Sequence, residues 1–226
     1  MTFLITAGPT REPLDPVRYL TNRSSGKMGY AIAEAAALSG NRVILISGPT
    51  QLEIPDGVDF IPVETAQEMF DVVLKWIDIA GVAIFTAAVA DYRPANLAEQ
   101  KIKKQEGQNR MTLELVKNVD ILGSARALMG FSGLLVGFAA ETENLEQYAK
   151  SKLKKKGCDI VFANDVSGAD TGFDVDQNAL LMVTKNQTKD LGRHSKKELG
   201  KMVVQATLEH LGKGCRFEEP CPPECC

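Results

Sequence analysis

Short runs of apolar and β-branched residues alternate along this chain with segments of helical periodicity. One of the helical segments, 143–156, begins with glutamates and ends with lysines, the order that the helix dipole favours. Strands that are apolar throughout and separated by helices are typical of a parallel sheet covered on both faces. The pattern therefore predicts an α/β protein with a doubly wound, mainly parallel, Rossmann-like sheet. The expected strands are 2–7, 42–48, 58–63, 82–88, 133–140 and 158–165, and the other expected helices are 26–39, 65–80 and 118–129.

The pattern changes toward the C-terminus. The apolar stretch ALLMVT, 179–184, followed by KDLGRH, 189–194, predicts a C-terminal β-hairpin extension, and 195–211 predicts a last helix. No change of composition marks a second domain, so we expect one domain over 1–212. The remaining residues, 213–226, form a Cys- and Pro-rich tail that we expect to be disordered.

Composition and charge argue against two classes of binding partner, nucleic acid and membranes. Of the 226 residues 44% are hydrophobic, and the formal net charge of −3 gives no general affinity for nucleic acid or an anionic membrane, which reward a basic surface. No apolar run reaches the roughly 18 residues that a membrane span needs. Before the tail the only cysteine is Cys158, which leaves no framework of structural disulfides. We therefore expect a cytoplasmic protein with neither nucleic acid nor membrane as a partner.

The helix expected over 26–39 begins with unusually small residues. An α-helix leaves its first N–H groups unpaired, and small side chains let an anion approach them closely. Ser24, Ser25 and Gly26 are therefore candidates to bind a phosphate, although a serine N-cap followed by glycines for close packing explains the same residues without a ligand. The spacing fits neither a Walker loop nor the G-x-G-x-x-G turn of dinucleotide-binding folds, and the second strand ends in Ser47 rather than an acidic residue. These departures argue against an ordinary NAD site.

Other polar residues lie where the strands are expected to end, which is where ligands of doubly wound sheets bind. The connection 9–22 is long, and we expect Arg11, Arg18 and Asn22 to face the same space as the helix start. Asp91 follows the fourth strand and can orient a polar ligand there.

Two groups of lysines have two interpretations each. Lys101, Lys103 and Lys104 form either a solvated run of charge or a flap that closes over polyphosphate. Lys152 and Lys156 lie one helical turn apart and are either surface charges or ligands of an anion.

Seven longer stretches, taken in order, carry a resemblance. They are ITAGPTREPLDPVRYLTNRSSGKMG, AAVADYRP, EQKIKK, VKNVDIL, VGFAAET, KLKKKG and ANDV. Together they are similar to the phosphopantothenoylcysteine synthetase (phosphopantothenate–cysteine ligase) domain of the bifunctional flavoprotein of bacterial coenzyme A biosynthesis. The resemblance covers about residues 3–211. It implies a ligase that joins 4′-phosphopantothenate to L-cysteine: CTP activates the carboxylate as an acyl-cytidylate and releases pyrophosphate, with Mg²⁺ assisting, and the cysteine amine then displaces CMP.

The resemblance also implies roles for particular residues. Asn22 matches the family's asparagine that holds the acyl-cytidylate, Arg18 its companion arginine, and Lys101 the flap lysine that helps to form this intermediate. Val119 stands where the family more often has proline. The resemblance identifies no metal ligands. The implied nucleotide contacts are Phe85, Thr86, Ala87, Asp91, Lys101, Val119, Asp120, Ile121, Leu122, Phe138, Lys152 and Lys156.

The resemblance extends to partners. Members of the family are dimers with sites near the subunit interface, so it implies a homodimer and makes a separate phosphopantothenoylcysteine decarboxylase a candidate partner. Two other functions stay open: a divergent NAD(P)-binding oxidoreductase, which only the fold class favours, and a non-catalytic nucleotide-binding subunit of a decarboxylase complex. The choice of CTP over ATP rests on the resemblance alone.

Overall fold

The structure, a computed structural model, describes residues 1–103, 107, 109–141, 143–165 and 176–212. The tail 213–226 and Lys104 lie outside the described residues, so the predictions made for them stay predictions.

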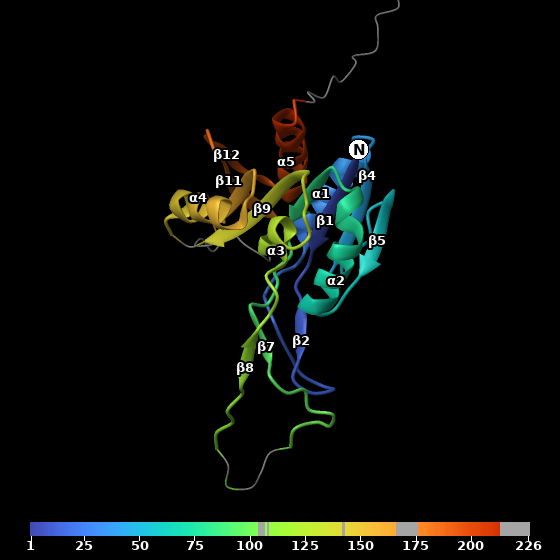
Figure 1. The fold of residues 1–226 in the computed structure, drawn as a ribbon, viewed down its shortest axis with the longest axis vertical. Helices are drawn as coiled ribbons and strands as arrows, with labels where there is room; N and C mark the ends of the chain where they lie inside the picture. The colour runs from blue at the N-terminus through green and yellow to red at the C-terminus, as the bar shows by residue number, and fades with distance from the viewer. Residues whose placement is uncertain (104–106, 108, 142, 166–175, 213–226) are drawn as a thin grey trace, which may run out of the picture.

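One eight-stranded sheet forms the centre of the molecule (Figure 1). Its order is β12-β11-β10-β9-β6-β1-β4-β5, in which the strands from β10 to β5 run parallel and the β11–β12 hairpin adds two antiparallel strands. This confirms the predicted doubly wound, mainly parallel fold with its C-terminal hairpin. The strands are β1 Thr2–Ala7, β4 Arg42–Ser47, β5 Val58–Pro62, β6 Val82–Phe85, β9 Leu134–Glu141, β10 Ile160–Asp165, β11 Gln177–Thr184 and β12 Thr188–Ser195.

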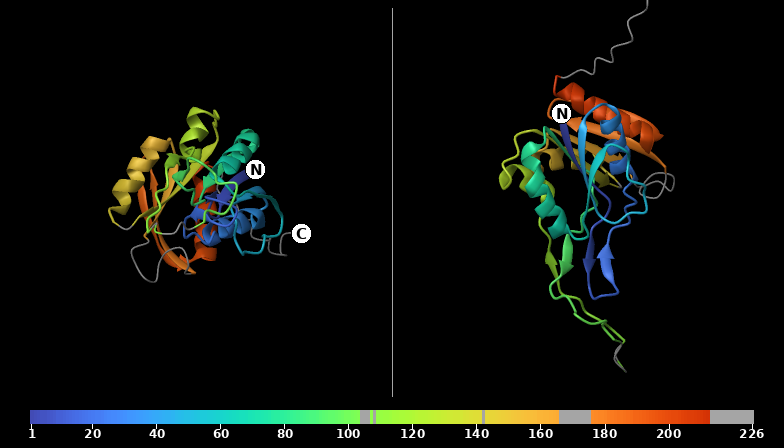
Figure 2. Two further views of the ribbon diagram at one scale, coloured as in Figure 1. Left: turned by 90° about the horizontal axis from the view of Figure 1, so that it is seen from below. Right: turned by 90° about the vertical axis from the view of Figure 1, so that its right-hand side faces the viewer.

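Helices cover both faces of the sheet (Figures 1 and 2). Successive residues of β1 point to opposite faces of the sheet. Phe3 and Ile5 pack in the core beside α1 and α5, and Leu4 packs in the core beside α2, α3 and α4. Because both faces are buried, each central strand is a continuous apolar run rather than an alternating one. The helices are α1 Lys27–Leu38, α2 Ala66–Trp76, α3 Ile121–Ala127, α4 Leu145–Lys156 and α5 Lys196–His210.

Several elements are shorter than predicted. The helix expected over 65–80 continues beyond α2 only as a short 3₁₀ turn, Ile77–Ile79. The helix expected over 118–129 begins late because Asp120 caps α3, its carboxylate accepting a hydrogen bond from the Gly123 N–H at 2.9 Å. The cap places Asp120 at the carboxyl edge of the sheet, beside the ends of the parallel strands.

Two small ribbons project from the carboxyl edge of the sheet, and the sequence pattern does not predict them (Figures 1 and 2). Each is an antiparallel pair of three-residue strands: β2 Arg11–Pro13 with β3 Tyr19–Thr21, and β7 Tyr92–Pro94 with β8 Leu115–Lys117. We call residues 11–21 and the described part of 92–117 the arm. A three-residue strand is too short for a detectable alternation, so the sequence predicts only a long loop and a charged segment here.

Candidate functional site

Two adjoining cavities lie at the carboxyl edge of the sheet. The larger has a volume of about 500 Å³ and the smaller about 250 Å³. Ala87, Val89, Phe138 and Lys152 line both, so the cavities share a wall. Their position agrees with the rule that ligands of doubly wound sheets bind where the parallel strands end.

The larger cavity gathers most of the residues to which the resemblance assigns the nucleotide. Thr86 instead lines the smaller cavity, and Lys101 lines neither. Lys117 and Asn118, in the quoted VKNVDIL stretch, also line the larger cavity although the sequence analysis gives them no role. The predicted residues on this cavity are Phe85, Ala87, Asp91, Val119, Asp120, Ile121, Leu122, Phe138, Lys152 and Lys156.

Charged side chains of both signs line the larger cavity. Three of them are lysines, Lys117, Lys152 and Lys156, and two are carboxylates, Asp91 and Asp120. Three ammonium groups on one cavity suit a ligand with several negative charges, such as a polyphosphate. The arrangement favours the second interpretation of Lys152 and Lys156, as ligands of an anion.

The lysines are held in place by neighbouring groups. The Lys156 ammonium donates to the Asp120 carboxylate, and Lys152 Nζ donates to the Phe138 carbonyl at 2.5 Å. Partial burial raises the pKa of Asp120, but the hydrogen bonds from Lys156 and the Gly123 N–H and the charges of both lysines outweigh it and lower that pKa overall. Asp120 is therefore ionised at neutral pH and keeps Lys156 beside the cavity.

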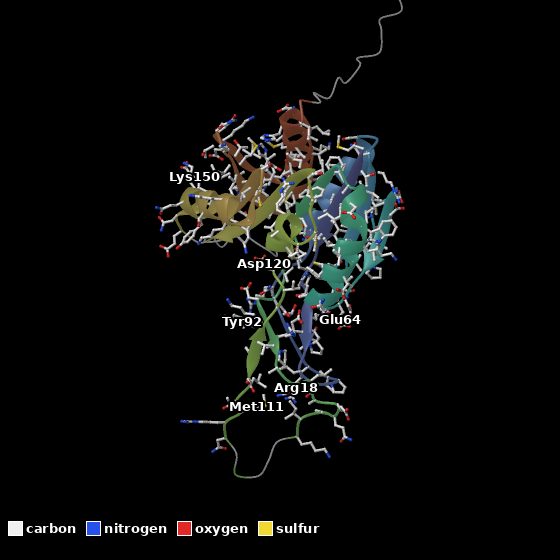
Figure 3. The ribbon with its side chains drawn as sticks, viewed as in Figure 1. Arg18, Glu64, Tyr92, Met111, Asp120 and Lys150 are labelled. Atoms are coloured by element: carbon white, nitrogen blue, oxygen red, sulfur yellow. The ribbon has the colours of Figure 1, made fainter. Side chains whose placement is uncertain are left out.

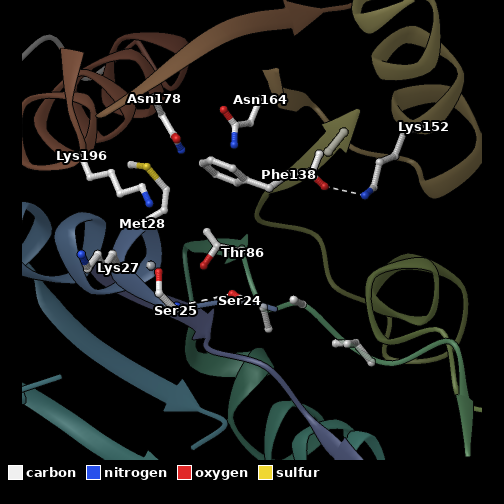
Figure 4. A pocket seen from close by; sticks show the side chains of 17 residues that line it. Ser24, Ser25, Lys27, Met28, Thr86, Phe138, Lys152, Asn164, Asn178 and Lys196 are labelled. Atoms are coloured by element: carbon white, nitrogen blue, oxygen red, sulfur yellow. Dashed lines mark hydrogen bonds between the residues drawn. The ribbon is translucent and has the colours of Figure 1, made fainter. Parts of the chain in front are cut away.

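The smaller cavity lies at the start of α1 (Figure 4). Ser24, Ser25 and Gly26 line it, as the anion-binding interpretation requires. Gly26 is the N-cap residue with a φ of 78°, a left-handed conformation that glycine adopts without strain, and its N–H donates to the Ser24 hydroxyl at 3.4 Å. No side chain caps α1, so the alternative of a serine N-cap is wrong.

Close packing does explain one glycine of the same stretch. A Cβ at Gly29 would clash with Thr86 Oγ1 and with the Cβ of Ala7. The first turn of α1 therefore sits directly on the ends of β1 and β6, which brings its N–H groups to the smaller cavity.

The structure adds three residues to the smaller cavity, of which only the first lies in a stretch that the sequence analysis quotes, ANDV. They are Asn164 from β10, Asn178 from β11 and Lys196 from α5. Asn178 is 3% exposed and Lys196 6% exposed. These residues are distant from Ser24 in the sequence, and only the order of strands in the sheet brings them to the same cavity. No local pattern could have identified Asn178 and Lys196, whereas Asn164 stands at the end of an expected strand, where ligands of such sheets bind.

Asn22 lies beside the shared wall without lining either cavity. Its side-chain N–H₂ donates to the carbonyls of Ala88 and Val89 at 3.1 and 3.2 Å. Ala88 and Val89 belong to the loop after β6 that lines the cavities. Asn22 therefore links the end of β3 to this loop and fixes the boundary between the two cavities.

The two arginines of the connection 9–22 lie on the arm instead. The Arg11 guanidinium stacks over the Tyr19 ring at 4.6 Å. Arg18 donates to the Asp15 carboxylate and to the Ile102 carbonyl at 3.0 Å. Figure 3 shows Arg18 on the arm, away from the sheet. Neither arginine lines a cavity. The expectation that they face the same space as the helix start is therefore wrong: ribbon formation carries them away from α1.

Asp15 is the central residue of the arm and the sequence analysis overlooks it. It is 2% exposed and accepts hydrogen bonds from the N–H groups of Val17 and Arg18, each at 2.9 Å, and of Ile102 at 3.1 Å. The hydrogen bond from the Arg18 side chain lowers the pKa of Asp15, and the backbone donors add to this effect against the opposing effect of burial. Asp15 thereby joins the two ribbons and fixes the backbone beside Lys101.

The lowered pKa of Asp15 predicts an acid-sensitive arm. The carboxylate stabilises the folded arm above an ordinary carboxyl pKa of about 3.9, and this contribution is lost as the pH falls below that value. At neutral pH we expect the Asp15→Ala variant to exchange the amide protons of Val17, Arg18 and Ile102 about ten-fold faster than the unsubstituted chain, because each loses its acceptor. Hydrogen-exchange mass spectrometry or NMR measures this.

The exposed Asp56 provides the control for this experiment. Asp56→Ala should leave the three exchange rates unchanged. Equal exchange rates in Asp15→Ala and the unsubstituted chain would contradict the assignment of Asp15 as the acceptor that holds the arm.

A divalent cation fits the larger cavity. The described residues contain no group of three or more His, Cys, Asp or Glu side chains that could hold a metal by themselves. Mg²⁺, however, is usually held by one or two carboxylates together with water and the phosphates of a substrate. Asp91 and Asp120 supply such carboxylates on the cavity with the three lysines. These two residues would hold the ion.

The fold and the site together define a doubly wound α/β domain with two adjoining cavities, both lined by lysine, at the carboxyl edge of its sheet. The family model described as the DNA/pantothenate metabolism flavoprotein C-terminal domain matches residues 1–211. The chain belongs to this family. No helix in the described part of the chain is long and apolar enough to cross a membrane.

Named relatives agree with this membership. The chain is 50% identical over 208 residues to the coenzyme A biosynthesis bifunctional protein CoaBC of Vibrio cholerae, covering 92% of this chain and 52% of that protein. It is 47% identical over 205 residues to CoaBC of Escherichia coli, covering 90% and 50%. The chain thus spans about half the length of the curated relatives it matches.

A solved structure supports the fold. The C-terminal domain of a coenzyme A biosynthesis bifunctional protein CoaBC superposes with a TM-score of 0.78 at 41% identity, covering 93% of this chain and 95% of that one. The predicted resemblance to the synthetase domain and the predicted fold class are both confirmed.

Proposed function

We propose that the chain is a phosphopantothenate–cysteine ligase, which joins 4′-phosphopantothenate to L-cysteine at the expense of CTP in coenzyme A biosynthesis. The observation that carries the proposal is the pair of adjoining cavities, one suited to a polyphosphate and the other to a single anion, with one wall in common. Two ligands bound in this way meet at that wall. The names of the relatives, which are coenzyme A biosynthesis proteins, support the same activity.

The proposed reaction needs positioning and charge neutralisation. A carboxylate oxygen of the acid attacks the α-phosphorus of CTP, the bond to the β-phosphate breaks, and pyrophosphate leaves. The cysteine amine then attacks the acyl carbon, and CMP leaves with the oxygen that came from the carboxylate. Lys117, Lys152 and Lys156 would neutralise the phosphates during the first step. A bound Mg²⁺ would add further neutralisation there.

The protein supplies no nucleophile of its own in this scheme. Among the described residues, no histidine or cysteine lines either cavity. The one described cysteine, Cys158, is buried, which raises the pKa of its thiol to about 12. Catalysis would come from holding the two substrates with their reacting atoms in contact, an effect that can supply much of the rate enhancement of such a reaction. Asn22 contributes by fixing the wall at which the substrates meet.

A homodimer belongs to the same proposal. Lys101 adjoins Ile102 on the arm and lines neither cavity of its own chain. The arm also exposes many apolar side chains, as a surface that binds another protein does. A second copy of the chain would cover them and would place one arm over the cavities of the other subunit. The exposed residues are Val17, Tyr19, Tyr92, Leu97, Met111, Leu113, Leu115 and Val116.

Assays of pyrophosphate and CMP release test the proposed activity directly. Purified protein with Mg²⁺, 4′-phosphopantothenate and cysteine should release pyrophosphate from CTP, more slowly from ATP, and none when phosphopantothenate is left out. Absence of CMP in the complete mixture would contradict the proposal.

Binding of NADPH at micromolar concentration without a response to CTP would favour the oxidoreductase instead. Activity only after addition of a separate decarboxylase would favour the non-catalytic subunit. We also propose that the chain is cytoplasmic and that a separate phosphopantothenoylcysteine decarboxylase is its partner.

A further inference from the structure

A buried lysine, Lys196, lines the smaller cavity. Lys196 is the first residue of α5 and is 6% exposed. The helix dipole opposes a positive charge at the first position of a helix, and burial of a charged group is costly. Lys27, which lines the same cavity, is likewise the first residue of its helix, α1. Two lysines at helix starts beside one cavity point to a negatively charged ligand.

The backbone fixes Lys196 in this position. Ser195 caps α5 by accepting a hydrogen bond from the Glu198 N–H at 3.2 Å, and the Glu198 carboxylate accepts one from the Ser195 N–H at 3.0 Å. The Lys196 N–H donates to the Asp176 carbonyl at 2.8 Å. The start of α5 is thus attached both to its own first turn and to the residue before β11. Lys196 is therefore a preorganised part of the cavity wall.

Lys196 is more buried than the other two lysines of this cavity. Lys27 Nζ pairs with the Asp176 carboxylate at 2.6 Å, and Lys152 Nζ donates to the Phe138 carbonyl. Both are more exposed than Lys196. In Figure 4 the Lys196 side chain points toward Met28, on the side of the cavity that faces Phe138. Of the three, Lys196 is the most buried cation on the cavity.

The other lining groups fit a phosphate. Ser24, Ser25 and Thr86 supply hydroxyls, Asn178 supplies an amide, and the N–H groups at the start of α1 lie beside them. None of the described residues that line this cavity is acidic. The Asp176 carboxylate pairs with Lys27 and interacts electrostatically with Lys196, but it does not line the cavity. A dianion in the cavity would therefore meet donors and positive charge.

We infer, on the basis of the proposed function, that Lys196 is the specificity-determining residue for the phosphate of the acid substrate, selecting the phosphorylated acid over the same acid without its phosphate. The apolar Met28 and Phe138 border the rest of the cavity and are suited to the uncharged body of that acid. The carboxylate at its other end would lie at the wall shared with the nucleotide cavity.

Lys196→Met tests this inference because methionine keeps most of the side-chain volume and removes the charge. We expect the KM for 4′-phosphopantothenate to rise about 10- to 100-fold, which is the loss of one charge-assisted hydrogen bond, while the KM for CTP changes less than about two-fold. The preference for 4′-phosphopantothenate over pantothenate should fall by the same factor. Lys196→Gln is measured in parallel. If Lys196→Met folds poorly, Lys196→Gln should show the same fall in the preference for 4′-phosphopantothenate over pantothenate.

Lys197→Met is the matched control. Lys197 is the next residue of α5, is exposed, and pairs with Glu34 at 3.0 Å away from the cavity. It should behave like the unsubstituted chain. An unchanged preference in both Lys196 variants, or an equal rise of both KM values, would overturn the inference while leaving the proposed function intact. An unsubstituted chain that releases no CMP would instead contradict the proposed function.

Discussion

Replacing Asn22 by aspartate is expected to reduce turnover about 100-fold or more while leaving the fold intact, which is the effect of removing one preorganised donor from an active site. Asn22 donates to the carbonyls of Ala88 and Val89. An ionised aspartate cannot donate, and it places a negative charge against two carbonyl oxygens and near the proposed acyl phosphate. The side chain is exposed, so the core is not disturbed. Release of CMP gives turnover, and thermal melting reports the fold.

Asn41→Asp is the matched control for this variant. The Asn41 side chain also donates to two carbonyls, of Ala36 at 3.2 Å and of Ser39 at 3.3 Å, but it does so at the far end of α1. It should change the melting temperature and not the turnover. Turnover of Asn22→Asp equal to that of the unsubstituted chain would remove Asn22 from the catalytic residues.

The second large effect is expected for Lys101→Gln, which should slow formation of the acyl-cytidylate about 100-fold or more. The adjacent Ile102 is held by Asp15 and Arg18, so the position of Lys101 on the arm is defined although its side chain is exposed. Glutamine keeps a polar side chain of nearly the same length and removes the charge that would stabilise the reacting phosphate. A pyrophosphate burst measured before steady state isolates this step. Lys103→Gln, an exposed neighbour, should leave the burst unchanged.

The two variants together test whether the arm acts on its own subunit or on its partner. In a mixed dimer of Asn22→Asp and Lys101→Gln chains, one site contains both natural residues if Lys101 reaches across the interface. Activity should then reappear when the inactive variants are mixed and exchange subunits. Mixed dimers that form and stay inactive would contradict the arrangement proposed for the arm.

The sequence predicts the sheet well because its strands are buried on both faces. Runs such as 43–46 are apolar throughout, so their type follows from the residue pattern alone. The ribbons of the arm lack such a signal because each strand has three residues. Ribbon pairing moves Arg11 and Arg18 away from the helix start at which the sequence places them.

The site is predictable only in part. The small residues at the start of α1 have a direct physical signal, and the structure places Ser24 on a cavity. The residues of the larger cavity depend on the resemblance, because no pattern in the sequence connects Asp91 with Lys152. Asp15 could be predicted from the local sequence, because an aspartate before proline often accepts hydrogen bonds from the next N–H groups of a turn. No local sequence pattern identifies Lys196, because it reaches its cavity only through the pairing of β10, β11 and β12.

The central claim, that a carboxylate and a nucleotide react at the wall between the two cavities, is tested most directly by isotope transfer. Phosphopantothenate labelled with ¹⁸O in both carboxylate oxygens is incubated with CTP, cysteine and Mg²⁺, and the CMP is examined by mass spectrometry. The account predicts one ¹⁸O in each CMP, because the acyl–oxygen bond breaks when the amine attacks the acyl carbon. Formation of the amide with unlabelled CMP, or of no CMP at all, would contradict it.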